Sequence, residues 1–92
     1  MMKLENRSAV LKRLARIEGQ IRGVARMIED DRYCIDIVRQ LQAVRAALGA
    51  VETVVLEDHV DTCVDDALKG GDLARRREKV EELVAVLAGR KK

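Results

Sequence analysis

The sequence predicts an all-α fold of three helices, in which a long antiparallel helical hairpin is followed by a short C-terminal helix. The 92 residues contain no Pro and a single aromatic residue, Tyr33, so the frequent turns of a β-sandwich or barrel are missing. Apolar residues make up 48% and charged residues 37%, which excludes a disordered polyelectrolyte and is typical of long helices. Apolar residues also recur at intervals of three and four along most of the chain.

The first predicted helix carries one apolar stripe, which consists of Val10, Leu14, Ile17, Ile21, Val24 and Ile28. Asn6 or Ser8 is expected to cap its start. Gly19 and Gly23 lie inside the helix and each weakens it by roughly 1 kcal/mol relative to Ala. We therefore expect another helix to approach closely at these glycines. Residues 29–32 are polar and predict a short turn.

The second predicted helix runs from Cys34 to Leu68, and Gly70 and Gly71 end it. Its apolar stripe contains Val38, Leu41, Val44, Leu48, Val51 and Val55. A helix of this length would measure roughly 50 Å, and the first helix can cover only part of it. A single small domain, residues 1–92, also buries only roughly 60–65% of its unfolded surface. Both arguments predict an oligomer.

The third predicted helix begins after Asp72, a suitable N-cap, and its apolar positions are Leu73, Val80, Leu83, Val84 and Leu87. Arg75, Arg76 and Arg77 lie in its first turn, where the helix dipole disfavours cations. Three arginines at such a place suggest an external anion, although a short exposed helix can also tolerate them.

Charge is unevenly distributed along the chain, despite a formal net charge of +2. Residues 1–32 carry 8 basic and 5 acidic side chains, residues 33–72 carry 3 and 8, and residues 73–92 carry 7 and 3. In the first helix, Lys12, Arg16, Arg22 and Arg26 lie opposite the apolar stripe. Such a face is either simply solvated or contacts the phosphates of duplex DNA. No aromatic residue interleaves these charges, so single strands are a poorer partner.

The two cysteines and the only histidine can be read as one metal site. His59 and Cys63 are four residues apart on one helical face, a pair that by itself is more often structural. Cys34 begins the same helix 25 residues before His59, roughly 37 Å away. If two such helices pack antiparallel about a two-fold axis, Cys34 of one lies beside His59 and Cys63 of the other. Two thiolates and one imidazole suit Cu(I), whereas Zn(II) would need water or Asp61 as a fourth ligand.

The remaining features exclude several functional classes. The charged N-terminus is unlike a signal peptide, and no apolar run approaches the roughly 20 residues of a membrane span. We therefore expect a cytoplasmic protein without membrane contact, in which cysteines are reduced thiols rather than a disulfide. The chain has no Gly-rich phosphate loop and predicts little concavity for a substrate, so we do not expect an enzyme.

The chain resembles the copper-sensing repressor (CsoR) family of bacterial transcription factors. The resemblance rests on Cys34 followed by His59-Val-Asp-Thr-Cys63, and on the stretches LARIEGQIRG (14–23), DRYC (31–34) and RQLQAVRAAL (39–48). It implies a homodimer forming a four-helix bundle, which pairs into a homotetramer. It also implies that the metal-free oligomer binds double-stranded operator DNA and that Cu(I) releases it. Copper-resistance genes would thereby be derepressed.

Residue by residue, the resemblance implies three groups of functional side chains. The Cu(I) ligands would be Cys34, His59 and Cys63. The link between the metal and DNA affinity would be made by Tyr33 and Glu82, with Glu81 as a substitute for Glu82. The DNA contacts would be made by Lys12, Arg13 and Arg16. Some relatives carry a basic residue where this chain has Ala50, so no DNA contact is transferred there.

Three alternatives remain open at this stage. One is a persulfide or formaldehyde sensor on the same scaffold, acting through Cys34. Persulfide sensors generally lack the His and formaldehyde sensors the last Cys, so His59 and Cys63 together favour copper. Another is a cytosolic copper buffer without DNA binding, against which the basic face of the first helix speaks. The third is a purely structural helical oligomer.

Overall fold

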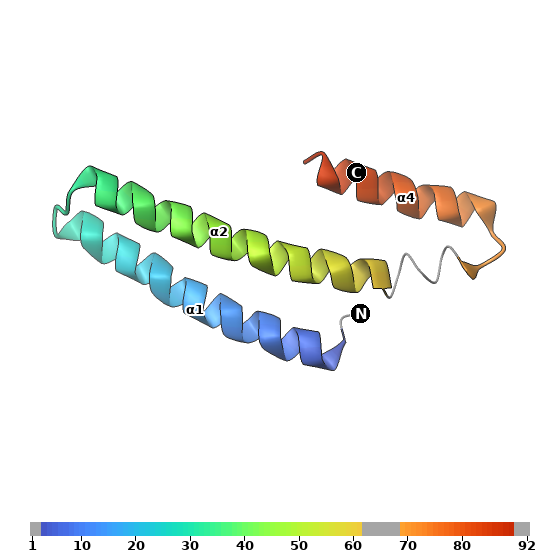
Figure 1. The fold of residues 1–92 in the computed structure, drawn as a ribbon, viewed down its shortest axis with the longest axis horizontal. Helices are drawn as coiled ribbons and strands as arrows, with labels where there is room; N and C mark the ends of the chain where they lie inside the picture. Colours follow the sequence, from blue (N-terminus) through green and yellow to red (C-terminus); the bar gives the residue numbers. More distant parts are fainter. Residues whose placement is uncertain (1–2, 62–68, 90–92) are drawn as a thin grey trace. The chain divides into compact units, whose positions relative to one another are not determined.

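A computed structural model describes residues 3–61 and 69–89 of the chain. Within these residues it contains three α-helices and no strand, which confirms the all-α fold class (Figure 1). The helices are α1 (Leu4–Glu29), α2 (Cys34–His59) and α4 (Leu73–Leu87). The chain divides into two compact units, Met2–Leu56 and Glu57–Lys92 with Met1, and each is described by itself. The expectation of a single domain stays a prediction.

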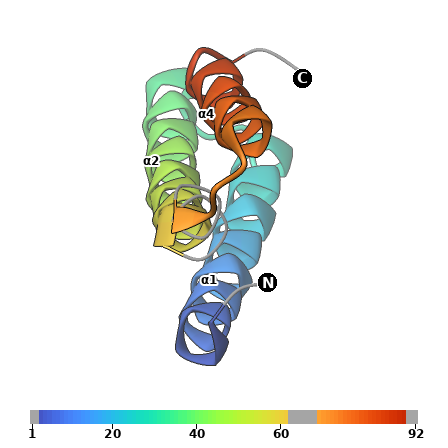
Figure 2. The ribbon, with the colours of Figure 1, turned by 90° about the vertical axis from the view of Figure 1, so that its right-hand side faces the viewer.

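The first unit is the predicted helical hairpin, in which α1 and α2 lie side by side and run in opposite directions (Figures 1 and 2). Its core consists of Val10, Ile17 and Val24 from α1 with Val44 and Val51 from α2, so the buried positions on each helix recur every seventh residue. Ile37, Ala47 and Val54 pack against this core. The hairpin therefore buries one narrow seam of each helix.

The structure divides the predicted apolar stripe of α1 into two halves. Val10, Ile17 and Val24 are buried, but the alternating members Leu14, Ile21 and Ile28 are exposed, Ile21 by 51%. One antiparallel neighbour covers only the strip of a helix that faces it, so the second half of the stripe stays exposed in this hairpin.

The start of α1 differs from the sequence prediction. The helix begins at Leu4 after Lys3, and Asn6 and Ser8 lie inside it rather than capping it. The Arg7 N–H already donates to the Lys3 carbonyl at 2.9 Å. Leu4, Glu5 and Arg7 in this first turn are good helix formers, and the acidic Glu5 suits the helix dipole, so the helix begins without a side-chain cap.

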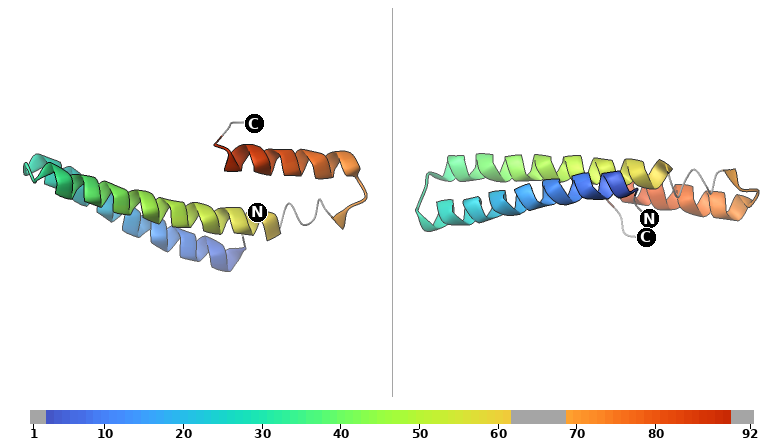
Figure 3. Two further views of the ribbon diagram at one scale, coloured as in Figure 1. Left: turned by 45° about the horizontal axis from the view of Figure 1, so that its top comes forward. Right: turned by 90° about the horizontal axis from the view of Figure 1, so that it is seen from below.

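Figure 3 shows the short turn that joins α1 to α2 at one end of the hairpin. Backbone hydrogen bonds close this turn. The Arg32 N–H donates to the Met27 carbonyl at 2.9 Å, and the Asp31 N–H donates to the Ile28 carbonyl at 3.2 Å. Asp31 itself has a φ of 52°, in the left-handed region. This is a Schellman motif, in which Asp31 takes the place usually held by Gly. The polar turn predicted at residues 29–32 is thus confirmed.

The far end of α2 also differs from the prediction. The α-helix ends at His59, and Val60 and Asp61 form a wider π-type turn. The predicted continuation to Leu68 falls on residues 62–68, which lie outside the described part.

Asp72 caps α4 as predicted, because its carboxylate accepts the Arg75 N–H at 3.2 Å. Among the described residues, no helix combines the length and apolarity that crossing a membrane requires. Within α4 itself no residue is buried, so the predicted apolar positions of this helix are uncovered or only partly covered.

Candidate metal centre and basic face

Cys34, the first predicted metal ligand, is the first residue of α2. The preceding Tyr33 carbonyl accepts the N–H groups of Asp36 and Ile37 at 3.0 and 3.2 Å, which fixes the start of the helix at this point. The Cys34 thiol is free and exposed, and the Tyr33 ring beside it in sequence is exposed as well. The Schellman turn therefore presents one accessible thiol at this end of the hairpin.

His59, the second predicted ligand, is the last residue of α2 and contacts α4 within the unit Glu57–Lys92. Its Nε2 lies 3.7 Å from Oε1 of Glu82, and the two side chains are 27% and 34% exposed. This separation is within ion-pair range but too long for a hydrogen bond. Glu81, the substitute considered for Glu82, is exposed. The acid that faces the histidine is thus Glu82.

The two predicted ligands that the structure describes, Cys34 and His59, lie far apart within one chain. Cys34 and His59 occupy opposite ends of the 26-residue helix α2, which at 1.5 Å per residue places them roughly 37 Å apart. No group of three His, Cys, Asp or Glu side chains suited to a metal forms among the described residues. Cys63 lies outside the described residues.

The basic residues predicted to contact DNA lie on the exposed surface of α1. Lys12, Arg13 and Arg16 are all exposed, and none forms an ion pair with another residue that the structure describes. Arg22 differs, because its Nη1 donates to Oε1 of Glu18 at 2.9 Å. One member of the predicted basic face, Arg22, is thus paired with Glu18, while Lys12, Arg16 and Arg26 form no ion pair with a described residue.

The three arginines at the start of α4 are not equivalent. The Arg76 guanidinium donates through Nε and Nη2 to the Gly70 carbonyl, at 3.0 and 2.7 Å, and so joins α4 to the preceding loop. Sequence reasoning missed this contact, although a Gly-Gly pair before a helix leaves a carbonyl open to such a donor. An external anion is not needed to explain Arg76.

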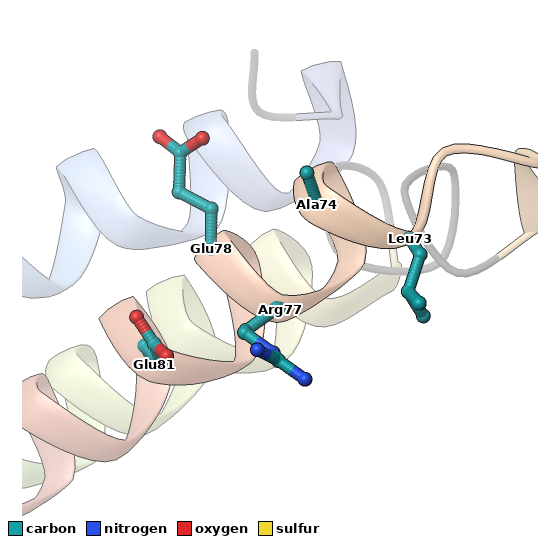
Figure 4. A pocket seen from close by; sticks show the side chains of 5 residues that line it. All are labelled: Leu73, Ala74, Arg77, Glu78 and Glu81. Carbon is teal, nitrogen blue, oxygen red and sulfur yellow. The ribbon is translucent and has the colours of Figure 1, made fainter.

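A shallow hollow of about 350 Å³ lies along the first two turns of α4 (Figure 4). Arg77 shares it with two carboxylates, and its lining consists of Leu73, Ala74, Arg77, Glu78 and Glu81. The two negative charges oppose a bound anion at Arg77.

Asp58 is a second feature that sequence reasoning missed. It is buried, directly before His59, and continues the seven-residue series Ile37, Val44 and Val51 on α2. That series was the available signal, because it places position 58 on the inward side of the helix.

The sequence of this chain matches known proteins over most of its length. Residues 6–89 match the sequence model of a family described as metal-sensitive transcriptional repressors. The chain is 50% identical over 68 residues to the copper-sensing transcriptional repressor CsoR of Bacillus subtilis, a match that covers 74% of this chain and 67% of that protein. It is 52% identical over 60 residues to the copper-sensing transcriptional repressor RicR of Mycobacterium tuberculosis, covering 65% and 62%. The matched segments thus span about two thirds of these relatives' lengths.

A solved structure is also similar over nearly the whole chain. The crystal structure of the copper-sensing repressor CsoR with Cu(I) from Geobacillus thermodenitrificans superposes with a TM-score of 0.85 at 40% identity. That match covers 97% of this chain and 90% of the other. From the extent of the family match and the shared fold, the chain belongs to the family of metal-sensitive transcriptional repressors.

Proposed function

We propose that this protein is a cytoplasmic Cu(I)-responsive transcriptional repressor. In this proposal the metal-free oligomer binds double-stranded operator DNA, and Cu(I) binding between subunits releases it and derepresses copper-resistance genes. The observation that carries the proposal is the placement of an exposed Cys34 thiol and of His59 at opposite ends of one helix. Each of these side chains can take part in a complete metal site only if a second subunit supplies the other donors. The copper-sensing relatives support the same conclusion.

The donor set fits Cu(I). Cys34 of one subunit would be joined by His59 and Cys63 of the other, which offers two thiolates and one imidazole. Soft thiolates select Cu(I), and three ligands suit its trigonal preference. When bound, the ion would hold the ends of two subunits together. Two equivalent sites would form in each antiparallel dimer.

The uncovered apolar residues of the hairpin support a dimer. On α1 they include Leu14, Ile21 and Ile28, and on α2 they include Val38, Leu41, Leu48 and Val55. A hairpin that leaves a second apolar strip open on each helix is suited to pair with another copy as a four-helix bundle. Pairing of two such dimers into a homotetramer is part of the proposal.

Coupling between metal and DNA would pass through His59. Its Nε2 faces Glu82 of α4, which leaves Nδ1 for the metal. Binding of the metal would bring the imidazole N–H and the Glu82 carboxylate into a hydrogen bond and so draw α4 toward the site. Tyr33, next to Cys34, would be the second linking residue. DNA would be held by the exposed cations Lys12, Arg13 and Arg16 of α1 through its phosphates.

A titration of DNA with and without Cu(I) tests the proposal. A duplex would be selected by the metal-free protein from a random-sequence pool, and its binding measured by anisotropy at fixed salt. One Cu(I) per subunit should weaken binding by about 10- to 100-fold, the usual size of such couplings. Metal binding without any DNA binding would identify a copper buffer instead. Release by a persulfide or formaldehyde, but not by Cu(I), would identify the other sensor class.

A further inference from the structure

The helix α2 has a second, exposed seam besides the one that packs on α1. Its members alternate at spacings of four and three residues between Val38 and Val55, so they share one face of the helix. The apolar members are Val38, Leu41, Leu48 and Val55, and the charged members are Arg45 and Glu52. All six are exposed, Val38 by 46% and Leu48 by 44%.

The two charged residues of this seam have no ion-pair partner in the part of the chain that the structure describes. Arg45 and Glu52 are seven residues apart, roughly 10 Å along the axis, which is too far for an ion pair with each other. Neither forms an ion pair with any other residue that the structure describes. Opposite charges placed in the middle of an apolar seam are the usual means by which helices select a partner and a register.

An antiparallel second copy of α2 satisfies both charges at once. The midpoint between Arg45 and Glu52 lies between positions 48 and 49. A two-fold axis at this midpoint, perpendicular to the helices, places each Arg45 opposite the Glu52 of the other copy. The residues flanking the axis are Leu48 and Gly49. A Cβ at Gly49 would meet nothing within 4 Å in the single chain, so this face is open to close approach by the other copy.

The same register brings the proposed metal ligands together. In the sequence, the midpoint between Cys34 and Cys63 is the same as that between Arg45 and Glu52, between positions 48 and 49. His59 of one copy would lie four residues, roughly 6 Å along the axis, from the level of the other copy's Cys34. A parallel pair would instead oppose like charges and place each Cys34 beside another Cys34.

We infer that Arg45 and Glu52 form two symmetric ion pairs across the dimer axis, and that these pairs set the antiparallel register in which the metal site is assembled. The inference rests on the proposed function, in which two subunits share each metal site. It adds the residues that select a second copy of this chain and its orientation.

Charge-reversal variants test the inference, and the quantity measured is the dissociation constant of the dimer. Arg45→Glu and Glu52→Arg each place two like-charged pairs at the axis, which should weaken dimerisation about tenfold or more. The double variant carrying both changes should return to within about threefold of the parent, since it restores both attractions. Arg39→Glu, an equal charge change on an exposed residue of α2 outside the seam, is the matched control and should leave the dimer unchanged.

Mixing distinguishes the two orientations. Antiparallel pairing of the parent with the double variant opposes like charges at both positions, so the two proteins should sort into homodimers in native mass spectrometry. A parallel dimer would favour the mixed species. Single variants that dimerise as the parent does, or mixed dimers at or above the statistical proportion, would overturn the inference.

The proposed function is tested separately with the parent protein. If charge reversal has no effect while Cu(I) still releases DNA, only the inference about register fails. If the parent forms no dimer, the shared metal site fails with it.

Discussion

Asp31 holds a left-handed backbone conformation in the hairpin turn, at φ 52°. Its carboxylate-bearing Cβ is crowded there, whereas Gly adopts this region without penalty. The residue ends α1 and, through the bonds of Arg32 and Tyr33, sets the starting point of α2 and hence of Cys34. One strained residue thus determines where a proposed metal ligand lies.

We expect Asp31→Gly to raise the free energy of unfolding by about 0.5–1 kcal/mol, because the conformational penalty is removed. Asp31→Val should lower it, since β-branched residues tolerate this region least. Urea titration at fixed protein concentration measures both. Asp30→Gly is the control, because Asp30 has a φ of −87° and gains nothing from Gly. A stabilised Asp30 variant beside an unchanged Asp31 variant would contradict the assignment.

Glu82 is expected to transmit metal binding rather than to hold the metal. Glu82→Ala should leave the three proposed ligands intact, so Cu(I) should still bind, while the coupling free energy between Cu(I) and DNA falls by about 1–3 kcal/mol. The measurement is a pair of DNA titrations, with and without Cu(I). Tyr33→Phe should act in the same direction. Glu81→Ala is the matched control, because Glu81 is an exposed neighbour on α4. Full release of DNA by both the Glu82 and the Tyr33 variants would refute the link.

At the scale of elements, α1 packs on α2 through one face and, in the proposed function, contacts DNA through another. Its buried residues recur every seventh position toward α2, and the cations Lys12 and Arg16 are four residues apart on one exposed side. Because these cations are unpaired with described residues, they retain their full charge for phosphates, whereas Arg22 shares its charge with Glu18. From this difference we predict a stronger phosphate contact by Lys12 and Arg16 than by Arg22.

Arg16→Ala should weaken binding of the selected duplex and lower the slope of log affinity against log salt. A tetramer loses up to four phosphate contacts by this change, so the slope should fall by as much as about 3–4 units. Arg22→Ala should change the slope less, since its guanidinium is held by Glu18. Equal slopes for the parent and the Arg16 variant would remove this residue from the DNA contact.

At the scale of the whole molecule, the proposed metal site exists only between chains. Neither Cys34→Ala nor His59→Ala homo-oligomers should bind Cu(I) tightly, because each lacks a ligand in both sites. After mixing and subunit exchange, a dimer of one variant with the other should regain one complete site, formed by the Cys34 of one chain and the His59 of the other. Competition with a Cu(I) chelator measures this recovery. Absence of any recovered site in mixed oligomers would exclude the antiparallel arrangement.

Much of this protein was predictable because helical periodicity is a local property. The three helices, the turn at residues 29–32 and the Asp72 cap follow from spacing, polarity and capping chemistry within a few residues. The predicted start of α1 was wrong by a few residues, because several neighbouring residues can begin a helix and no local signal distinguishes among them. The Arg76 contact with Gly70 depends on a side-chain conformation that composition does not specify.

The sequence by itself determined the fold class, the family, and the residue types that suit Cu(I), because these depend on pattern and on donor chemistry. Only the tertiary structure decided which half of each apolar stripe is buried, since that depends on which strip faces the neighbouring helix. It alone brought Glu82, rather than Glu81, within 3.7 Å of His59, because the rotation of α4 about its axis is set by packing. It also separated the exposed seam of α2 from the buried one, which the period of both seams leaves indistinguishable.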